Sequence, residues 1–161
     1  MNHPADCTHP EHHVHDADSF VAEVESVCRE RGLRLTPIRS EVLRMVADAD
    51  GPVKAYDLLD RMRATRGTAA PPTVYRALDF LLEHGFIHRL ASVNAFIGCH
   101  HPRLRQHSVP FLICDRCQAT VELEDEDTAR GLEQQARALG FRPEGHTLEV
   151  HGLCAKCSAE D

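Results

Sequence analysis

Hydrophobic residues recur at helical spacing near the start of the chain. Asp18 and Ser19 precede the first such stripe as candidate caps, and Gly32 follows it as a stop signal. The spacing predicts an amphipathic helix whose apolar face points into a core. The residues of this face are Phe20, Val24, Val27 and Cys28.

Three more helical patterns follow in the first half. Thr36 and Pro37 suit the N-cap and first position of the second helix. A fourth helix is expected over about residues 73–84, after a breaker at 67–72 and before Gly85. The inward residues of the three helices are Ile38, Val42, Met45 and Val46, then Ala55, Leu58, Leu59 and Met62, then Val74, Ala77, Leu78 and Leu81.

The helical pattern gives way to a strand pattern at residues 86–99. If Ser92 to Ala95 closes a two- or four-residue loop, His88 stands directly opposite Cys99, with Cβ atoms roughly 4.5–5.5 Å apart. Two ligands of one metal ion need about that separation. A hairpin with an ordinary surface His and a small buried Cys is an equally good interpretation. Helices followed by such a hairpin are typical of a winged helix-turn-helix domain.

The second half has a different pattern. Strands are expected at 111–114, 120–123 and 146–151, and a helix at 127–139 that ends before Gly140. The helix would turn Leu132, Ala136 and Leu139 inward. A three-strand layer with a single helix leaves one sheet edge and face uncovered, which favours self-association.

These patterns predict an α+β protein: an N-terminal winged helix-turn-helix domain, then a small α/β domain that favours self-association. The expected boundaries are a His-rich disordered tail at 1–16, the DNA-binding domain at 17–99, a hinge at 100–108 and the dimerisation domain at 109–161. The tail holds five of the twelve histidines and Cys7, and it has no apolar periodicity. Adventitious metal binding explains it better than a dedicated storage role.

Two C-x-x-C pairs stand in the second half, with 36 residues between them. The pairs are Cys114 with Cys117, and Cys154 with Cys157. Each lets two sulfurs of one tight turn reach the same ion, so together they predict a structural zinc site. A redox-active dithiol is the weaker alternative. Two matched cysteine pairs in a small module are better suited to a closed metal site than to repeated oxidation and reduction.

Composition narrows the compartment and the class of protein. The first residues lack the basic and apolar regions of a signal peptide, which leads us to expect a cytoplasmic protein with reduced cysteines. No apolar run is long enough for a membrane span. A zinc hydrolase is disfavoured because no base and oxyanion donors accompany the metal ligands, so no enzyme and no small-molecule substrate are expected. The formal net charge of −7 means that any DNA-binding surface must be judged helix by helix.

The outward face of the fourth helix offers Tyr75 and Arg76 near its N-terminus. A recognition helix contacts base edges there, and Arg can pair with guanine in the major groove. Arg39 and Lys54 are candidate phosphate contacts. The alternative to a DNA contact is that these two side chains belong to an ordinary solvent-exposed helix face, as most neighbouring Arg and Tyr residues do. A protein-interaction module that binds zinc but no specific DNA sequence therefore remains an alternative. The absence of Tyr75 and Arg76 would have favoured that alternative, but both residues are present.

Together these motifs resemble the ferric uptake regulator (Fur) superfamily, and within it the zinc uptake regulators (Zur). The resemblance covers about residues 17–158. It rests on Leu35-Thr-Pro-Ile-Arg39, Lys54-Ala-Tyr-Asp-Leu-Leu59, Pro72-Thr-Val-Tyr-Arg-Ala-Leu-Asp-Phe-Leu-Leu82, His84-Gly-Phe-Ile-His88, Cys114-Asp-Arg-Cys117 and His151-Gly-Leu-Cys-Ala-Lys-Cys157. It implies a zinc-dependent homodimeric repressor of zinc-uptake genes. Its N-terminal winged helix would bind palindromic operator DNA, and its second half would be a small α/β dimerisation domain with a Cys₄ zinc site.

The resemblance also implies roles for individual residues. His88, Cys99, His107 and Glu122 match the regulatory ligands, which gives two zinc ions per chain with the Cys₄ site. Tyr75 and Arg76 match base-contacting positions, and Tyr56 a backbone or groove contact. The residues alone do not favour Glu122 over Glu124, or His107 over His101. A thiolate among the ligands suits Zn²⁺, whereas His and carboxylates alone would suit Fe²⁺ or Mn²⁺ and a regulator of another metal.

The chain departs from the family pattern at the third metal site found in many members. Val109-Pro-Phe111 stands where iron-sensing relatives carry His-x-His, and Ala129 stands in the place of an acidic ligand. A third site of that kind is therefore not expected. His100, His101 and His146 are candidates for a different one.

Overall fold

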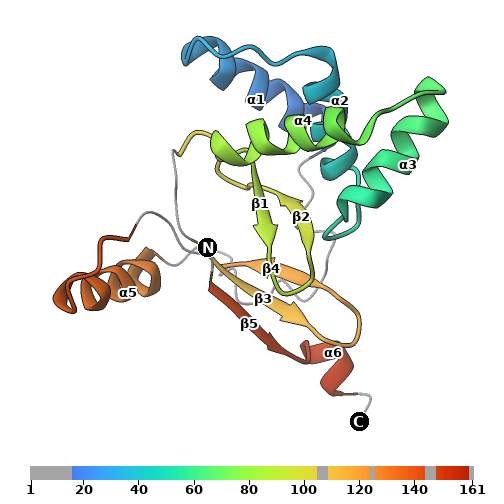
Figure 1. Ribbon diagram of the computed structural model, residues 1–161. Coiled ribbons are helices and arrows are strands. Elements are labelled where there is room, and N and C mark those ends of the chain that lie inside the picture. The colour runs from blue at the N-terminus through green and yellow to red at the C-terminus, as the bar shows by residue number, and fades with distance from the viewer. Residues whose placement is uncertain (1–15, 105–108, 124–125, 144–147, 160–161) are drawn as a thin grey trace. The chain divides into compact units, whose positions relative to one another are not determined.

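The computed structural model describes residues 16–104, 109–123, 126–143 and 148–159 (Figure 1). They divide into two compact units, one before and one after residues 105–108. The predicted fold class is confirmed, with helices and a wing in the first unit and a small sheet with a cysteine cluster in the second. The predicted domain boundaries remain predictions, and the His-rich residues 1–15 lie outside the described residues. No helix in the described ranges has the length and apolarity needed to cross a bilayer.

The first two helices begin at side-chain caps. Helix α1 (Ala17–Glu30) is capped by Asp16, whose carboxylate accepts from the Ser19 backbone N–H at 3.2 Å. The predicted cap at Asp18 and Ser19 is therefore wrong, because the carboxylate that reaches the free N–H groups lies three residues before Ser19. Helix α2 (Pro37–Ala47) begins as predicted: Thr36 accepts from the Arg39 N–H at 3.4 Å.

Helices α3 (Ala55–Arg66) and α4 (Pro71–Glu83) complete the helical layer. Helix α4 begins two residues earlier than predicted. Pro71 and Pro72 break a helix in its interior but fit its first positions, where no N–H is needed. Gly85 follows with φ +73°, a left-handed conformation that glycine adopts without strain.

The core of the first unit follows the predicted stripes. Every inward residue predicted for α4 is 2% exposed or less, and the stripe of α1, Cys28 included, is 5% exposed or less. Ile38, Met45 and Ala55 pack against this core but are only partly buried. Leu43 and Phe86 were not in the predicted stripes and are fully buried.

The wing consists of β1 (Ile87–Leu90) and β2 (Ala95–Gly98), which pair in antiparallel fashion. His88 pairs with Ile97, so the predicted direct pairing of His88 with Cys99 is wrong by two residues. The loop is residues 91–94, because Ala95 is 2% exposed and belongs to the strand rather than the turn. Asn94 closes the loop at φ +49°, a conformation that Asn tolerates.

The second unit is a three-stranded sheet in the order β4-β3-β5. Strand β3 (Pro110–Cys114) pairs antiparallel with β4 (Thr120–Glu122) and parallel with β5 (Leu148–Gly152). All three strands were predicted to within two residues at their described ends. Residues 146 and 147, where the last strand was expected to begin, lie outside the described residues. A short helix α6 (Ala155–Ser158) was not predicted.

Helix α5 (Glu126–Ala138) lies to one side of this sheet (Figure 1). The prediction that its apolar residues point inward is wrong within this chain: Leu132 is 43% exposed and Leu139 is 78% exposed. Leu112 and Val150, neighbours in the sheet, are also exposed. Amphipathic periodicity shows that a helix has an apolar face that packs against another surface. It does not show whether that surface belongs to the same chain or to another.

Candidate metal centres and DNA-contacting face

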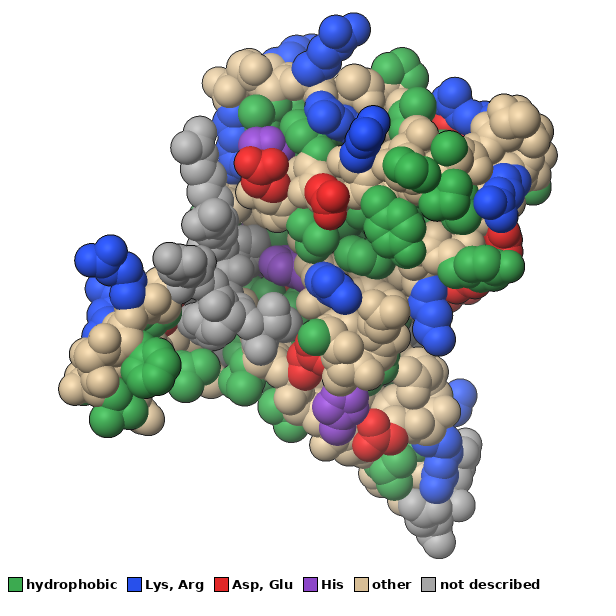
Figure 2. Space-filling model, in the orientation of Figure 1, with side chains coloured by type: hydrophobic (Ala, Val, Ile, Leu, Met, Phe, Trp, Pro, Cys, Tyr) green, Lys and Arg blue, Asp and Glu red, His purple; other side chains and the backbone are tan. Residues whose placement is uncertain are grey.

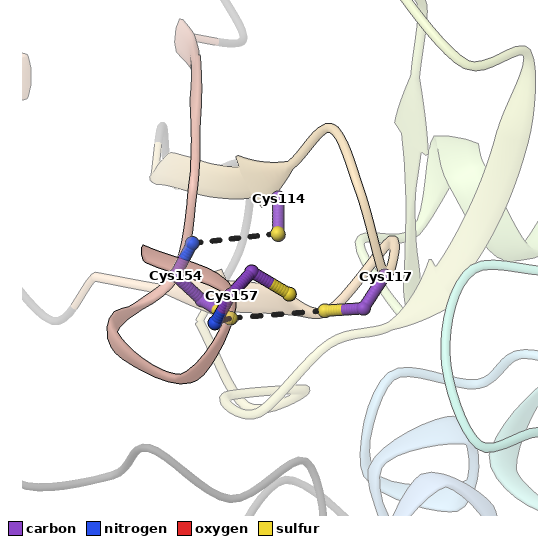
Figure 3. Close-up of side chains that lie close together, drawn as sticks. All are labelled: Cys114, Cys117, Cys154 and Cys157. Carbon is purple, nitrogen blue, oxygen red and sulfur yellow. Dashed lines mark hydrogen bonds between the residues drawn. The ribbon is translucent and has the colours of Figure 1, made fainter. Parts of the chain in front are cut away.

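The two C-x-x-C turns meet because of the parallel pairing of β3 with β5. Parallel strands end at the same edge of a sheet, and Cys114 at the end of β3 is level with Gly152 at the end of β5. The first turn leaves from Cys114, and the second follows Gly152 into α6. Figure 3 shows the resulting group of four side chains, Cys114, Cys117, Cys154 and Cys157.

Polar contacts connect the two turns directly. Arg116 donates from Nη1 to the Cys157 carbonyl at 2.7 Å, and His151 Nδ1 lies 2.9 Å from Asp115 Oδ1. The Asp115 backbone N–H donates to the Gly152 carbonyl at 2.8 Å. Arg116 and His151 were not predicted from the sequence to support the cysteine site. The available signal was their position inside or just before a cysteine turn.

The spacing of the sulfur atoms fits a tetrahedral ion. The Sγ atoms of Cys117 and Cys154 lie 3.8 Å apart, and all four sulfurs lie within 4.8 Å of one another. A Zn–S bond of about 2.3 Å gives a tetrahedron with edges of about 3.8 Å. Four cysteine sulfurs with this spacing are a donor set suited to structural zinc.

Backbone N–H groups prepare one sulfur of this cluster to bind a cation. Hydrogen bonds from the backbone of Cys117 and then of Cys154 lower the pKa of Cys114 to about 6, so this group is a thiolate at neutral pH. Burial is the largest cause that raises the pKa of Cys157 to about 12. Cys157 is therefore a protonated thiol at neutral pH, and binding of a metal cation to its sulfur would release that proton.

Two further candidate metal ligands, His88 and Cys99, lie on the wing of the first unit. A ring nitrogen of His88 and the Sγ of Cys99 lie within 4.8 Å of each other. They are diagonal neighbours on one face of the hairpin, because His88 pairs with Ile97 and Cys99 follows two residues later. Cys99 is 1% exposed, and its N–H donates to the Phe86 carbonyl at 3.0 Å. The predicted closeness thus holds in a different register.

The other expected regulatory ligands belong elsewhere in the chain. Glu122 is a buried residue of β4 in the second unit, paired with Phe111. His107 and His146 lie outside the described residues. Within the part of the chain that the structure describes, His100 and His101 join no group of three or more possible metal ligands.

The outward face of α4 is open to solvent. Tyr75 is 52% exposed, and Arg76 and Asp79 are exposed beside it. On α3, Tyr56 is 66% exposed, and Lys54 precedes the helix as an exposed residue. The face in Figure 2 carries Lys and Arg side chains over α3 and α4, with hydrophobic side chains exposed between them. Such a surface offers donors for phosphates and for base edges.

Arg39 differs from the other expected DNA contacts. Its guanidinium lies over the Phe80 ring and donates to the Arg34 carbonyl, so it holds parts of the first unit together. That Arg39 contacts a DNA phosphate remains a prediction. Such a contact would compete with the interactions that Arg39 makes with Phe80 and Arg34.

Comparisons with known proteins point to one family over most of the chain. The model of the ferric uptake regulator family matches residues 30–151. The zinc uptake regulation protein of Escherichia coli is 45% identical over 86% of this chain and 81% of its own length. A solved structure described as holo XcZur is 66% identical, with a TM-score of 0.83 over 88% of this chain and 99% of that chain.

A third similar protein is a zinc uptake regulator solved in complex with zinc and DNA. It is 42% identical, with a TM-score of 0.85 over 91% of this chain and 97% of that chain. The predicted resemblance, including its zinc uptake branch, is thereby confirmed. The chain belongs to the ferric uptake regulator family.

Proposed function

We propose that the protein is a zinc-responsive transcriptional repressor that binds palindromic operator DNA as a zinc-loaded homodimer and represses zinc-uptake genes. The observation that carries this proposal is the position of His88 and Cys99 on the wing of the unit that exposes Tyr75 and Arg76. Metal ligands on a DNA-binding unit link metal binding to DNA binding. The similarity to a zinc uptake regulator solved with zinc and DNA supports the same conclusion.

Each chain holds two zinc ions in this proposal. The structural ion binds Cys114, Cys117, Cys154 and Cys157, whose sulfur atoms all lie within 4.8 Å of one another. The regulatory ion binds His88, Cys99, His107 and Glu122. When bound, each ion supplies a tetrahedral cross-link that needs no redox chemistry. The Cys99 thiolate favours zinc over iron or manganese at the regulatory site.

The regulatory ligands come from three parts of the chain: the wing, the segment after it and strand β4. Ligands from both units, gathered on one ion, hold the two units at one angle. In a dimer this angle sets the separation of the two recognition helices α4. Operator half-sites lie about one helical turn apart, or a multiple of it, so only one separation matches. The predicted boundaries, with a hinge at 100–108, follow this division of roles.

A second copy of the chain covers the apolar surface of the second unit in this proposal. That surface includes Leu112 and Val150 on the sheet and Leu132 and Leu139 on α5, all exposed in one chain. Tyr75 and Arg76 contact bases, and Tyr56, Lys54 and Arg39 contact the backbone or groove. The protein acts in the cytoplasm as a regulator, without catalysis, a membrane or a small-molecule substrate.

The deciding test measures operator affinity with zinc, iron, manganese or a chelator present. His88→Ala and Cys99→Ala should each leave a folded dimer with about one zinc per chain. Zinc and DNA are linked by about 1–3 kcal/mol per site in such systems, and the variants should bring this coupling to near zero. The linkage is reciprocal, so operator DNA should tighten zinc binding in the parent protein by the same factor.

Cys28→Ala is the matched control, because Cys28 is equally buried in the same unit but has no place in the metal site. It should keep full zinc-dependent binding. A Cys99→Ala protein that still bound the operator only with zinc would rule out the wing ligands as the sensor. Activation of the parent by iron or manganese in place of zinc would identify a regulator of another metal.

A further inference from the structure

Arg31, the C-cap residue of α1, joins two distant parts of the first unit. Its Nη1 donates to the His84 carbonyl at 3.2 Å, just after helix α4. Its Nη2 donates to the Pro102 carbonyl at 3.2 Å and to the Arg103 carbonyl at 2.8 Å. One guanidinium therefore bonds both to the end of the recognition helix and to residues 100–103, here called the exit segment.

The exit segment is held from a second direction as well. Arg103 forms ion pairs with Glu30 at 3.2 Å and with Glu23 at 3.3 Å, both on α1. The Arg31 guanidinium carbon also lies over the ring of Phe86, 5.8 Å from its centre, and the Phe86 carbonyl accepts from the Cys99 N–H. Helix α1 thus sets the path of the chain as it leaves the wing.

The exit segment reaches the sulfur of a proposed zinc ligand. The His101 backbone N–H donates to Cys99 Sγ at 3.3 Å. An N–H bond to a thiolate is charge-assisted, and it sets the direction in which the sulfur presents its remaining lone pairs. Groups that orient a metal ligand in this way typically change metal affinity 10–100-fold when they are removed.

We propose that Arg31 is a positioning residue that links the recognition helix to the regulatory metal site. Through the Pro102 and Arg103 carbonyls it holds the His101 N–H on Cys99, and through the His84 carbonyl it holds the end of α4. A shift of either part changes the bonds to the other. This role rests on the proposed function, because it assumes that Cys99 binds the regulatory ion.

The geometry requires arginine rather than any cation. A planar guanidinium can donate to several carbonyls in fixed directions, whereas a lysine ammonium is a compact charge on a flexible stem. Arg31→Lys therefore keeps the charge and loses most of the bonds. Arg29→Lys is the matched control: Arg29 lies in the last turn of the same helix and is exposed.

The test uses the full chain with zinc kept in the Cys₄ cluster and Co²⁺ as the probe of the second site. The thiolate-to-cobalt absorption band then reports coordination by Cys99. Arg31→Lys should bind Co²⁺ about tenfold more weakly at this site. The His101 amide should exchange its hydrogen faster in the same variant without cobalt. Arg29→Lys should match the parent in both measurements.

Arg103→Gln provides a second variant in case Arg31→Lys does not fold. The Arg103 ion pairs are largely exposed and contribute little to stability, so this variant should fold. It should loosen the exit segment and weaken Co²⁺ binding, by less than Arg31→Lys. Parent-like cobalt affinity and His101 exchange in the folded variants would overturn the role of Arg31, while a parent that bound no Co²⁺ through a thiolate would overturn the proposed function itself.

Discussion

The guanidinium carbon of Arg39 lies 3.7 Å from the centre of the Phe80 ring. Arg39 belongs to α2 and Phe80 to α4, and the same guanidinium donates to the Arg34 carbonyl at 2.7 Å. A cation placed over an aromatic face is attracted by its quadrupole. Arg39 therefore braces the helix that presents Tyr75 and Arg76.

Arg39→Ala should lower the free energy of unfolding by about 1–2 kcal/mol, because it removes the contact with Phe80 and a charged hydrogen bond. Thermal unfolding of the variant measures this loss. Arg34→Ala is the control, since only the backbone of Arg34 takes part. A variant with parent stability but weaker operator binding would show that Arg39 acts on phosphates instead.

Arg76→Ala should weaken binding to a specific operator by about 1–3 kcal/mol and leave binding to random DNA less affected, because a base contact discriminates between sequences. Lys54→Ala should weaken both alike and reduce the salt dependence by about one unit of slope. Titrations on both DNAs at several salt concentrations separate the two roles. Equal losses for Arg76→Ala would make it a phosphate contact only.

Purified protein should contain about two zinc ions per chain, one removed by a mild chelator and one retained until unfolding. Cys114→Ser should lose the retained ion together with the folded second unit and the dimer, because four sulfurs share that ion. Metal analysis alongside sedimentation checks both outcomes. A folded, dimeric Cys114→Ser protein with unchanged zinc content would contradict the Cys₄ assignment.

Leu139→Glu should shift the dimer toward monomer, because it places a charge on a 78% exposed leucine of α5 that a second chain is proposed to cover. Leu104→Glu is the control on an exposed leucine of the first unit. Light scattering over a range of concentrations measures the effect. If Leu139→Glu stayed fully dimeric, α5 would lie outside the interface.

The Glu30 carboxyl should titrate below its usual pKa of 4.5, because the hydrogen bond from Arg103, and then the one from Ser26, favour its charged form. A lowered folded-state pKa contributes stability that is present above the ordinary value and is lost as the pH falls through the folded value. NMR titration of Glu30 should show this shift in the parent. In Arg103→Gln the pKa should rise toward 4.5, and an unchanged value would exclude Arg103 as its cause.

Local signals were sufficient to predict most elements of the fold. Helical periodicity gave the core faces of the first unit, and Thr36-Pro37 gave the start of α2, because these features depend on neighbouring residues. The cysteine turns were equally local, and their spacing predicted a shared site. The register of the wing was not local: it depends on the burial of Ala95, which a pattern of alternating residues does not reveal.

The remaining parts depend on contacts between distant residues or between chains. The leucines of α5 form the apolar face of an amphipathic helix, but they are exposed within this chain. The sequence pattern does not identify the surface that packs on them. The choice of Glu122 over Glu124 within an acidic run came only from family resemblance. Arg31 gave no signal in the sequence, because its partners lie 53 to 72 residues away.

The parallel pairing of β3 with β5 also has a consequence for biosynthesis. A ribosome releases the first unit complete, with α1 to β2, well before it releases β5 and the second cysteine turn. The central strand β3 must wait for its parallel neighbour, and Cys114 and Cys117 wait for Cys154 and Cys157. If the first unit reads DNA as proposed, a nascent chain presents that unit before the second unit can fold and pair with another copy. Truncated chains would then bind single half-sites as monomers.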